Sequence, residues 1–345
     1  MKKILLLALC FVFLTHSAHG EEVAPGRFEY TTEKMGVPVR LILCGDSKTE
    51  ADAAAEAVFQ RFDELNAVMS DYLRTSELIE VCRKCDETGE AVPVSDDLFE
   101  VLTQARHFDE LSGGAFDITV SPLVKLWRRS RTFGKLPPSD YLAEAKKRVG
   151  RENWELLAAE SNGNRNGKKS GSVRTLQKGV RFDLGGIAKG FAIDEGFRLL
   201  VERGFSRSLV DAGGDMRFGD APPGKKGWTI GIASLDPKAK AAFYRERENG
   251  AAATSGDTFR YVEIDGVRYS HLIDPRTGNP LTRHAVVTVF APTATEADAL
   301  ASALAVLGPN EGIALVDRLP NVEAILFQEN GDSPPETFLS AGFPK

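Results

Sequence analysis

The chain has 345 residues, 42% of them hydrophobic, and a formal net charge of −6 at pH 7. This length suits one large domain or two small ones, and the hydrophobic fraction is ordinary for a globular protein. No concentrated basic stripe interrupts the acidic balance, which argues against nucleic-acid binding.

Residues 1–20 have the pattern of a secretory signal peptide. Lys2 and Lys3 form a positive start, residues 4–14 are apolar, and Ala18-His19-Gly20 is a small-residue cleavage site. The apolar run is shorter than the roughly 20 residues that a membrane-spanning helix needs. We therefore expect cleavage near Gly20.

The remaining chain, residues 21–345, is expected to be soluble and periplasmic or otherwise extracytoplasmic. No later segment is long and uncharged enough to span a membrane. Cys10 lies inside the apolar run and not at the cleavage point, so we expect no lipid anchor.

The first half of the chain predicts a strand pair followed by helices. Residues 27–43 alternate like a hairpin, and apolar residues within 49–65 have helical spacing. Ser95 is a candidate N-cap for a helix that Gly113-Gly114 ends. Prolines at helix starts predict two further short helices, at 122–127 and 138–149.

The second half mixes strands with helices. Residues 161–173 form a polar surface loop and a possible subdomain boundary. Strands are expected at 173–184, 208–218, 228–233 and 286–290, a hairpin with an Asp-Gly turn at 259–269, and helices at 187–201 and 295–307. This mixture favours an α+β fold with mixed or antiparallel sheets. A dinucleotide fold is disfavoured, because no G-x-G-x-x-G joins a strand to a helix.

Cys82 and Cys85 form a C-x-x-C pair after the expected cleavage. No second pair or nearby histidine supplies the other ligands of a zinc site. The pair is either a local disulfide or two ordinary thiols.

Residues 271–280, His-Leu-Ile-Asp-Pro-Arg-Thr-Gly-Asn-Pro, are a candidate catalytic segment. They follow the predicted hairpin, so His271 leaves a sheet edge at a defined point. Asp274-Pro275 and Thr277-Gly278 then predict a constrained turn. An ordinary capped turn with a hydrogen-bonded histidine explains the run equally well.

Asp298 and Ser302 lie one turn apart on one face of the last predicted helix. A carboxylate and a hydroxyl are hard oxygen ligands of the kind that magnesium prefers. Taken alone, Asp298 could equally be a first-turn acid that stabilises the helix dipole.

Residues 183–190, Asp-Leu-Gly-Gly-Ile-Ala-Lys-Gly, precede a helix whose free N–H groups could bind phosphate. Lys189 would add a positive charge. A glycine-rich connection between a strand and a helix explains the same run without a ligand.

Several short runs together resemble the ApbE family of FAD:protein FMN transferases. The similarity extends from about Phe28 to about Phe327, and its specificity lies in the ordered set, since each piece alone is a weak turn signal. The runs are Met35-Gly36, 69–72, 113–120, 183–190, 211–215, 254–257, 271–280 and 298–302. The resemblance implies a two-lobed fold with helices flanking the sheets and a central cleft.

The resemblance also implies the ligands of the cleft. FAD would contact Met35, Tyr72, Ala115, Phe116, Asp117, Asp183, Lys189 and Leu272. Magnesium would be held by Asp298, the hydroxyl of Ser302 and the backbone carbonyl of Gly186. Serine replaces the family's usual threonine at 302, which keeps the oxygen but loses the methyl group that restricts the rotamer.

The implied reaction transfers FMN from FAD to a threonine or serine hydroxyl of an acceptor protein and releases AMP. His271 is the expected general base, because an imidazole titrates near neutral pH, and Asp274 could orient it. In the family, acceptors belong to membrane-linked electron-transfer systems. Two alternatives stay open: a magnesium-dependent FAD pyrophosphatase, and a non-catalytic periplasmic FAD-binding protein.

Overall fold

The computed structural model describes residues 26–159, 170–236, 241–258, 260–331 and 333–344. Its largest feature is an eight-stranded sheet in which every neighbouring pair is antiparallel. In spatial order the strands are β1 (Gly26–Lys34), β2 (Val37–Gly45), β6 (Ser208–Ala212), β7 (Asp215–Phe218), β10 (Gly250–Gly256), β13 (Ala285–Ala291), β14 (Glu323–Asn330) and β15 (Ser333–Leu339). The expected signal peptide lies outside the described residues.

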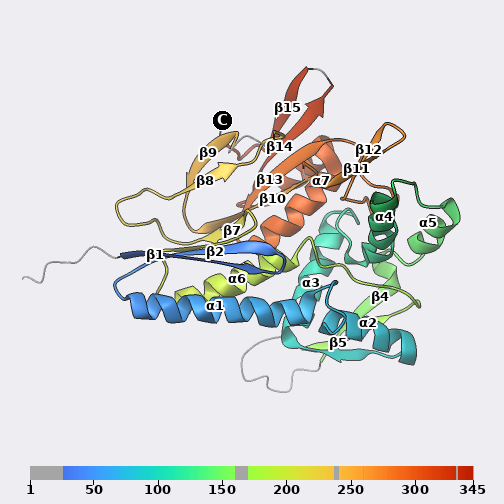
Figure 1. The fold of residues 1–345 in the computed structure, drawn as a ribbon, viewed down its shortest axis with the longest axis horizontal. Coiled ribbons are helices and arrows are strands. Elements are labelled where there is room, and N and C mark those ends of the chain that lie inside the picture. The colour runs from blue at the N-terminus through green and yellow to red at the C-terminus, as the bar shows by residue number, and fades with distance from the viewer. Residues whose placement is uncertain (1–25, 160–169, 237–240, 259, 332, 345) are drawn as a thin grey trace, which may run out of the picture.

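Three helices cover one face of this sheet: α1 (Lys48–Met69), α6 (Ala188–Glu202) and α7 (Ala294–Val316) (Figure 1). α1 buries a stripe at helical spacing that includes Ala54, Val58, Phe62 and Leu65. Contrary to the sequence analysis, α7 is by length and composition long and apolar enough to cross a membrane, but most of it is buried in the core. Its apolar composition therefore follows from its central position.

The other face of the sheet is covered by a hairpin of β8 (Trp228–Ile232) and β9 (Phe243–Arg247). Trp228 packs there in a second apolar cluster with Phe218, Phe290 and Phe343. Both faces of the large sheet are thus buried, which explains why all seven residues of β13 are buried.

A smaller lobe lies beside the ends of α1 and α7 (Figure 1). It contains a three-stranded sheet in the order β3 (Val92–Val94), β5 (Gly171–Thr175), β4 (Trp154–Ala158) and the hairpin β11 (Tyr261–Ile264) and β12 (Val267–Ser270). Its helical segments are α2 (Glu77–Thr88), α3 (Asp96–Leu111), η1 (Ile118–Val120), α4 (Ser121–Phe133), α5 (Ser139–Lys146) and η2 (Arg151–Asn153).

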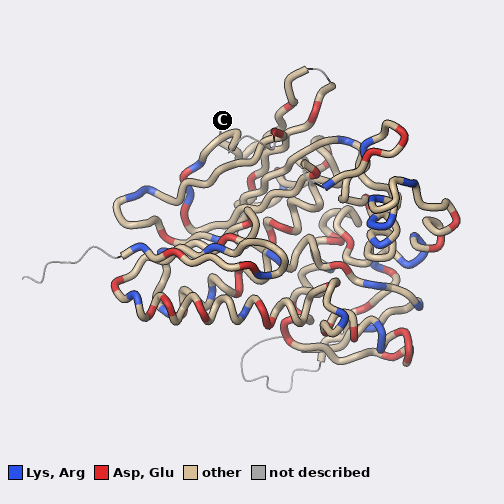
Figure 2. Tube along the Cα trace, viewed as in Figure 1, with Lys and Arg blue, Asp and Glu red and all other residues tan. Residues whose placement is uncertain are grey.

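The α+β class with antiparallel sheets is confirmed, and so is most of the local structure. Ser95 caps α3 through a bond from the backbone N–H of Leu98. Asp265 and Gly266 both have positive φ, 52° and 76°, as an Asp-Gly hairpin turn requires. Charges of both signs are interspersed along the chain, and α4 is conspicuously basic (Figure 2).

One expectation about the strands needs correction. The strand expected at 173–184 ends at Thr175, where its pairing with Trp154 at the start of β4 ends. β4 and β5, the strands on either side of residues 160–169, pair within one sheet, and the subdomain boundary expected near 161–173 stays a prediction. Cys82 and Cys85 are free buried thiols, the second of the two alternatives left open, and they lie on α2, a helix that the sequence analysis did not predict.

Candidate active site

A pocket of about 700 Å³ opens between the two lobes. It is lined by the β1–β2 turn, the segment after α1, the loop before η1, α4, the entry to α6, the end of β10, the segment 271–275 and one face of α7. Twelve of the residues expected to form the site line it: Met35, Tyr72, Ala115, Phe116, Asp117, Asp183, Gly186, Lys189, His271, Leu272, Asp298 and Ser302. The thirteenth, Asp274, does not.

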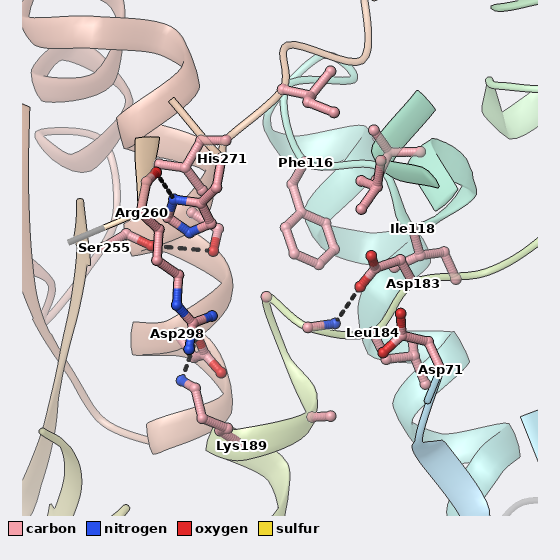
Figure 3. Close-up of a pocket in the computed structure, with 18 of the residues that line it drawn as sticks. Asp71, Phe116, Ile118, Asp183, Leu184, Lys189, Ser255, Arg260, His271 and Asp298 are labelled. Carbon is pink, nitrogen blue, oxygen red and sulfur yellow. Dashed lines mark hydrogen bonds and ion pairs between the residues drawn. The ribbon is translucent and has the colours of Figure 1, made fainter. Parts of the chain in front are cut away.

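His271 stands at the end of β12, half-buried at the wall of this pocket. Its backbone N–H donates to the carbonyl oxygen of Arg260 at 2.9 Å, and its ring Nδ1 lies 3.1 Å from the same oxygen (Figure 3). A carbonyl can only accept, so Nδ1 carries the proton and Nε2 keeps its lone pair. The ring is therefore in the tautomer that a general base needs.

Burial, together with the positive charges of Arg260 and Arg131, lowers the pKa of His271 to about 4. A group with this pKa is neutral at pH 7. The imidazole can accept a proton without first losing one.

Asp274 does not orient His271, which corrects the expectation from sequence. Both of its carboxylate oxygens bind Arg276, at 3.0 Å each, and Oδ1 also accepts from the backbone N–H of Arg276. Its backbone closes the turn with Asn279 and Gly278. The aspartate holds the turn behind His271, and the carbonyl of Arg260 positions the ring.

Lys189 and Asp298 form an ionic cluster where α6 begins beside α7. The ammonium group of Lys189 is paired with Asp215 and lies 3.6 Å from Oδ1 of Asp298. Asp298 is 4% exposed, and its burial raises its pKa to about 6, against the opposing effect of Lys189. Asp215 also accepts from the backbone N–H of Thr254, so the cluster connects both helices to the sheet.

The two helices approach closely because position 190 is glycine. A Cβ atom there would lie 2.3 Å from the carbonyl oxygen of Ala294, which no real contact tolerates. The backbone N–H of Gly190 donates to Oδ2 of Asp298 at 3.1 Å. The close packing thus directs the carboxylate of Asp298 toward the start of α6.

The residues expected to hold magnesium, Asp298, Ser302 and Gly186, all line this pocket. The hydroxyl of Ser302 lies 3.4 Å from that of Ser255, and a Cβ at Gly186 would lie 2.8 Å from the Ser302 hydroxyl, so the Gly186 backbone is adjacent. The described residues contain no group of three or more His, Cys, Asp or Glu side chains that could hold a metal. One carboxylate with hydroxyl and backbone oxygens suits magnesium, which completes its shell with water or substrate phosphate.

The opposite wall of the pocket is apolar and aromatic. Phe116 is buried and makes an edge contact with Phe108, at 6.3 Å between ring centroids. Tyr72 is 73% exposed, and the guanidinium of Arg128 lies 4.6 Å from its ring centroid. One open and one buried aromatic surface can flank a flat heterocycle.

Met35 occupies the β1–β2 turn with a positive φ of 51°, which is unusual for a residue other than glycine or asparagine. Such a conformation costs on the order of 1 kcal/mol or more. Its side chain lines the pocket. The strain is consistent with selection for a thioether at this point of the wall.

Asp117 and Asp183 shape their loops. Oδ1 of Asp117 accepts from the backbone N–H and hydroxyl of Thr119, at 2.7 and 2.6 Å. Oδ1 of Asp183 accepts from Gly185 at 2.9 Å. Burial raises the pKa of both carboxyl groups.

The polar pocket residues that were given no role from sequence include Ser255, Arg128, Arg131 and Arg260. Ser255 belongs to one of the recognised runs, which was the available signal for it. The other three, Arg128, Arg131 and Arg260, belong to no motif that was given a role, and only the packing of α4 and the hairpin brings them to the pocket.

Comparisons with known proteins show what the chain is similar to. The model of the ApbE family matches residues 35–326. The chain is 36% identical over 289 residues to the FAD:protein FMN transferase of Treponema pallidum (strain Nichols), covering 80% of this chain and 77% of that protein. It is 30% identical over 303 residues to the one of Escherichia coli (strain K12), covering 84% and 80%.

Solved structures resemble the fold over most of its length. The flavin transferase ApbE from Vibrio cholerae superposes with a TM-score of 0.78 at 27% identity, covering 92% of this chain and 98% of that one. The apo form of the flavinyl transferase ApbE from Pseudomonas stutzeri gives 0.77 at 25% identity, covering 92% and 96%.

Proposed function

The chain belongs to the ApbE family, and on this premise we propose that it is an FAD:protein FMN transferase. It moves the FMN moiety of FAD onto a threonine or serine hydroxyl of an acceptor protein and releases AMP. The observation that carries this proposal is the pocket itself, in which a neutral imidazole, an Asp298 and Lys189 cluster and an aromatic wall face one cavity.

The reaction exchanges the phosphoanhydride bond of FAD for a phosphoester bond to the acceptor. The acceptor oxygen attacks the phosphorus on the FMN side, the bond from that phosphorus to the bridging oxygen breaks, and AMP leaves with the bonding electrons. The hydroxyl proton passes to Nε2 of His271, whose other nitrogen is held by the Arg260 carbonyl.

The remaining residues bind and orient FAD. Phe116, Tyr72, Met35, Ala115 and Leu272 supply the surface for the flavin ring, while Lys189 contributes positive charge for the diphosphate. The segments shaped by Asp117 and Asp183 complete the wall.

Magnesium, when bound, neutralises charge on the diphosphate oxygens. Asp298 is its only charged ligand in this proposal, with the hydroxyl of Ser302 and the backbone carbonyl of Gly186 as further ligands. The buried carboxylate and the adjacent hydroxyl support this assignment.

The protein acts outside the cytoplasm in this proposal. The amino-acid pattern of residues 1–20 supports export, and the acceptor would be a component of a membrane-linked electron-transfer system. No contact of the described residues bears on the acceptor's identity.

The test is to incubate the protein lacking residues 1–20 with FAD, magnesium and candidate acceptor domains, and to measure intact masses. We expect the acceptor to gain one FMN moiety, and a matched acceptor with its hydroxyl residue changed to alanine to gain none. Release of free FMN with no modified acceptor would favour a pyrophosphatase. FAD binding without turnover would favour a binding protein.

A further inference from the structure

Four positively charged side chains line the pocket, and two of them are already neutralised. Lys189 is paired with Asp215 and Asp298. Arg128 lies 3.0 Å from Asp71 and 3.7 Å from Asp183. Lys189 and Arg128 therefore already form ion pairs within the protein when no ligand is bound.

The other two, Arg131 and Arg260, have no carboxylate within ion-pair distance among the residues that the structure describes. Arg131 is half-buried near the end of the basic helix α4. Burial lowers its pKa, and the nearby charges of Arg128 and Arg260 lower it further. A half-buried cation without a counter-charge is unfavourable in the free protein. An anionic ligand would remove this cost.

Both guanidinium groups act on the same part of the pocket, because both depress the pKa of His271. Arg260 extends into the pocket on the side that carries His271, Ser255 and Asp298, opposite Phe116 and Asp183 (Figure 3). The unneutralised positive charge therefore lies near the imidazole, with Arg131 close to Tyr72 and Arg260 on the side opposite Phe116.

We propose that Arg131 and Arg260 bind the phosphate of the departing nucleotide and stabilise the charge that it gains during transfer. This assignment rests on the proposed function. In FAD each phosphorus carries one negative charge. When the bond to the bridging oxygen breaks, the electron pair stays on the AMP phosphate, which becomes a dianion.

The chemistry of arginine fits this role. A guanidinium group presents a rigid fork of donors that matches two phosphate oxygens and stays charged at any working pH. Charges fixed in place before the reaction need no rearrangement as the leaving group develops its charge. A carboxylate partner for either arginine would compete with the phosphate, which accounts for the absence of one among the described residues.

The first experiment isolates the phosphate by titrating the protein lacking residues 1–20 with AMP and with adenosine, in magnesium buffer and again with EDTA. We expect wild type to bind AMP at least about tenfold more tightly than adenosine. Arg131→Gln and Arg260→Gln should each weaken AMP binding by about tenfold, the value of one charged hydrogen bond, and leave adenosine binding unchanged.

Arg129→Gln is the matched control, because Arg129 is an exposed arginine on the same helix outside the pocket. It should bind AMP like wild type, and thermal unfolding without ligand should show all three variants folded. Two results would overturn the proposal. One is equal affinity of wild type for AMP and adenosine, and the other is unchanged AMP binding in a variant that carries both Arg131→Gln and Arg260→Gln.

The second experiment measures transfer at saturating FAD. We expect Arg260→Gln to lower kcat by on the order of 10²-fold, as for loss of one fixed donor to a developing charge, with Arg260→Lys recovering part of the rate. A raised KM for the acceptor with unchanged AMP affinity would instead assign the arginines to an acidic segment of the acceptor. The AMP titration needs no acceptor, so a protein that binds AMP through these arginines but transfers no FMN contradicts only the proposed reaction.

Discussion

The imidazole of His271 is fixed by a backbone carbonyl, where a carboxylate would be the more familiar partner. The Arg260 oxygen holds Nδ1 without adding a negative charge beside the ring. Burial and two nearby arginines therefore keep the pKa of His271 low. At neutral pH the ring is unprotonated and can accept a proton, but its low pKa makes it a weaker base than an ordinary histidine.

Substituting His271 should separate chemistry from binding. We expect His271→Ala to slow FMN transfer by about 10²- to 10⁴-fold, the usual contribution of a general base, while FAD affinity stays close to that of wild type. His107→Ala, an exposed histidine on α3, is the control and should be fully active. Unchanged transfer in His271→Ala would remove this residue as the base. Lost FAD affinity with normal transfer at saturating FAD would make it a wall of the pocket.

The pH dependence of transfer should reveal the low pKa of His271. Because this pKa is lowered, the ring stays neutral as pH falls from 7 to about 5 and becomes protonated only near 4. We expect kcat/KM for FAD to hold over that range and then fall, provided that magnesium is high enough to keep Asp298, whose own pKa is about 6, ionised. Arg260→Gln removes a nearby positive charge, so it should move the acid limb to higher pH. If kcat/KM of the wild type instead fell with a midpoint near pH 6.5, His271 would not have the lowered pKa.

The lowered pKa of His271 also makes the free energy of unfolding depend on pH. Between the pKa of an ordinary histidine and the lowered value, the unfolded chain binds a proton that the folded chain does not. The contribution of His271 therefore makes the fold less stable as pH falls through this interval. Activity at low pH has to be compared with a melting curve at the same pH.

Asp298 is the second residue whose substitution is informative. We expect Asp298→Asn to abolish magnesium-dependent transfer while the protein stays folded, because asparagine can still accept from Gly190 and Lys189 keeps Asp215. Ser302→Ala should be milder, since it removes a neutral ligand. Full turnover by Asp298→Asn in saturating magnesium would show that Asp298 is not the magnesium ligand.

The junction of α6 and α7 is the element on which the site depends. Lys189 comes from the first turn of α6 and Asp298 from the first turns of α7, and their separation follows from how closely the two helices pack. The side chain of Asp194 adds to the junction by accepting from the backbone N–H groups of Ala294 and Thr295 at the start of α7.

Gly190→Ala should disturb this junction. The new methyl group would lie 2.3 Å from the Ala294 carbonyl oxygen, so the helices must separate, at a cost of about 1–3 kcal/mol of stability together with a loss of transfer. Gly224→Ala is the control, because it has φ of 71° but open space around the new methyl group. It should lose only about 1 kcal/mol through backbone strain and stay active. Chemical denaturation and transfer assays on both variants would check this, and a fully active Gly190→Ala would show that the helix spacing is not needed.

At the scale of the whole molecule, the pocket lies between lobes that share one continuous apolar core. The core cluster contains Phe62 of α1 and Leu300 of α7 together with Leu98 and Leu102 of α3. The lobes are therefore packed against each other before any ligand binds. A ligand in the cleft contacts both of them.

FAD should accordingly stabilise the protein more than FMN does. At a free concentration of 100 times Kd, a ligand raises the free energy of unfolding by about 2.7 kcal/mol. We expect the matching rise in Tm with FAD and a smaller one with FMN at equal concentration, because FMN lacks the adenylate half. Calorimetric titration gives both affinities. Equal or tighter binding of FMN would contradict the assignment of the pocket to the whole dinucleotide.

The local structure was determined by the sequence itself. The Asp265-Gly266 turn, the Ser95 cap and the stripe along α1 were predicted correctly, because each depends on residues a few positions apart. The motifs also named twelve residues that do line one pocket. Their assigned roles in binding and catalysis stay predictions until the experiments above are done.

Only the tertiary structure decided which groups face one another. It turned Asp274 toward Arg276, gave His271 the Arg260 carbonyl as its partner, and brought the unpaired guanidinium of Arg131 to the same pocket. The spacing of residues along the chain tells which side chains share a face of a helix or strand. It does not tell which faces meet, because that follows from the packing of elements that are distant in sequence, here α4, the β11–β12 hairpin and α7.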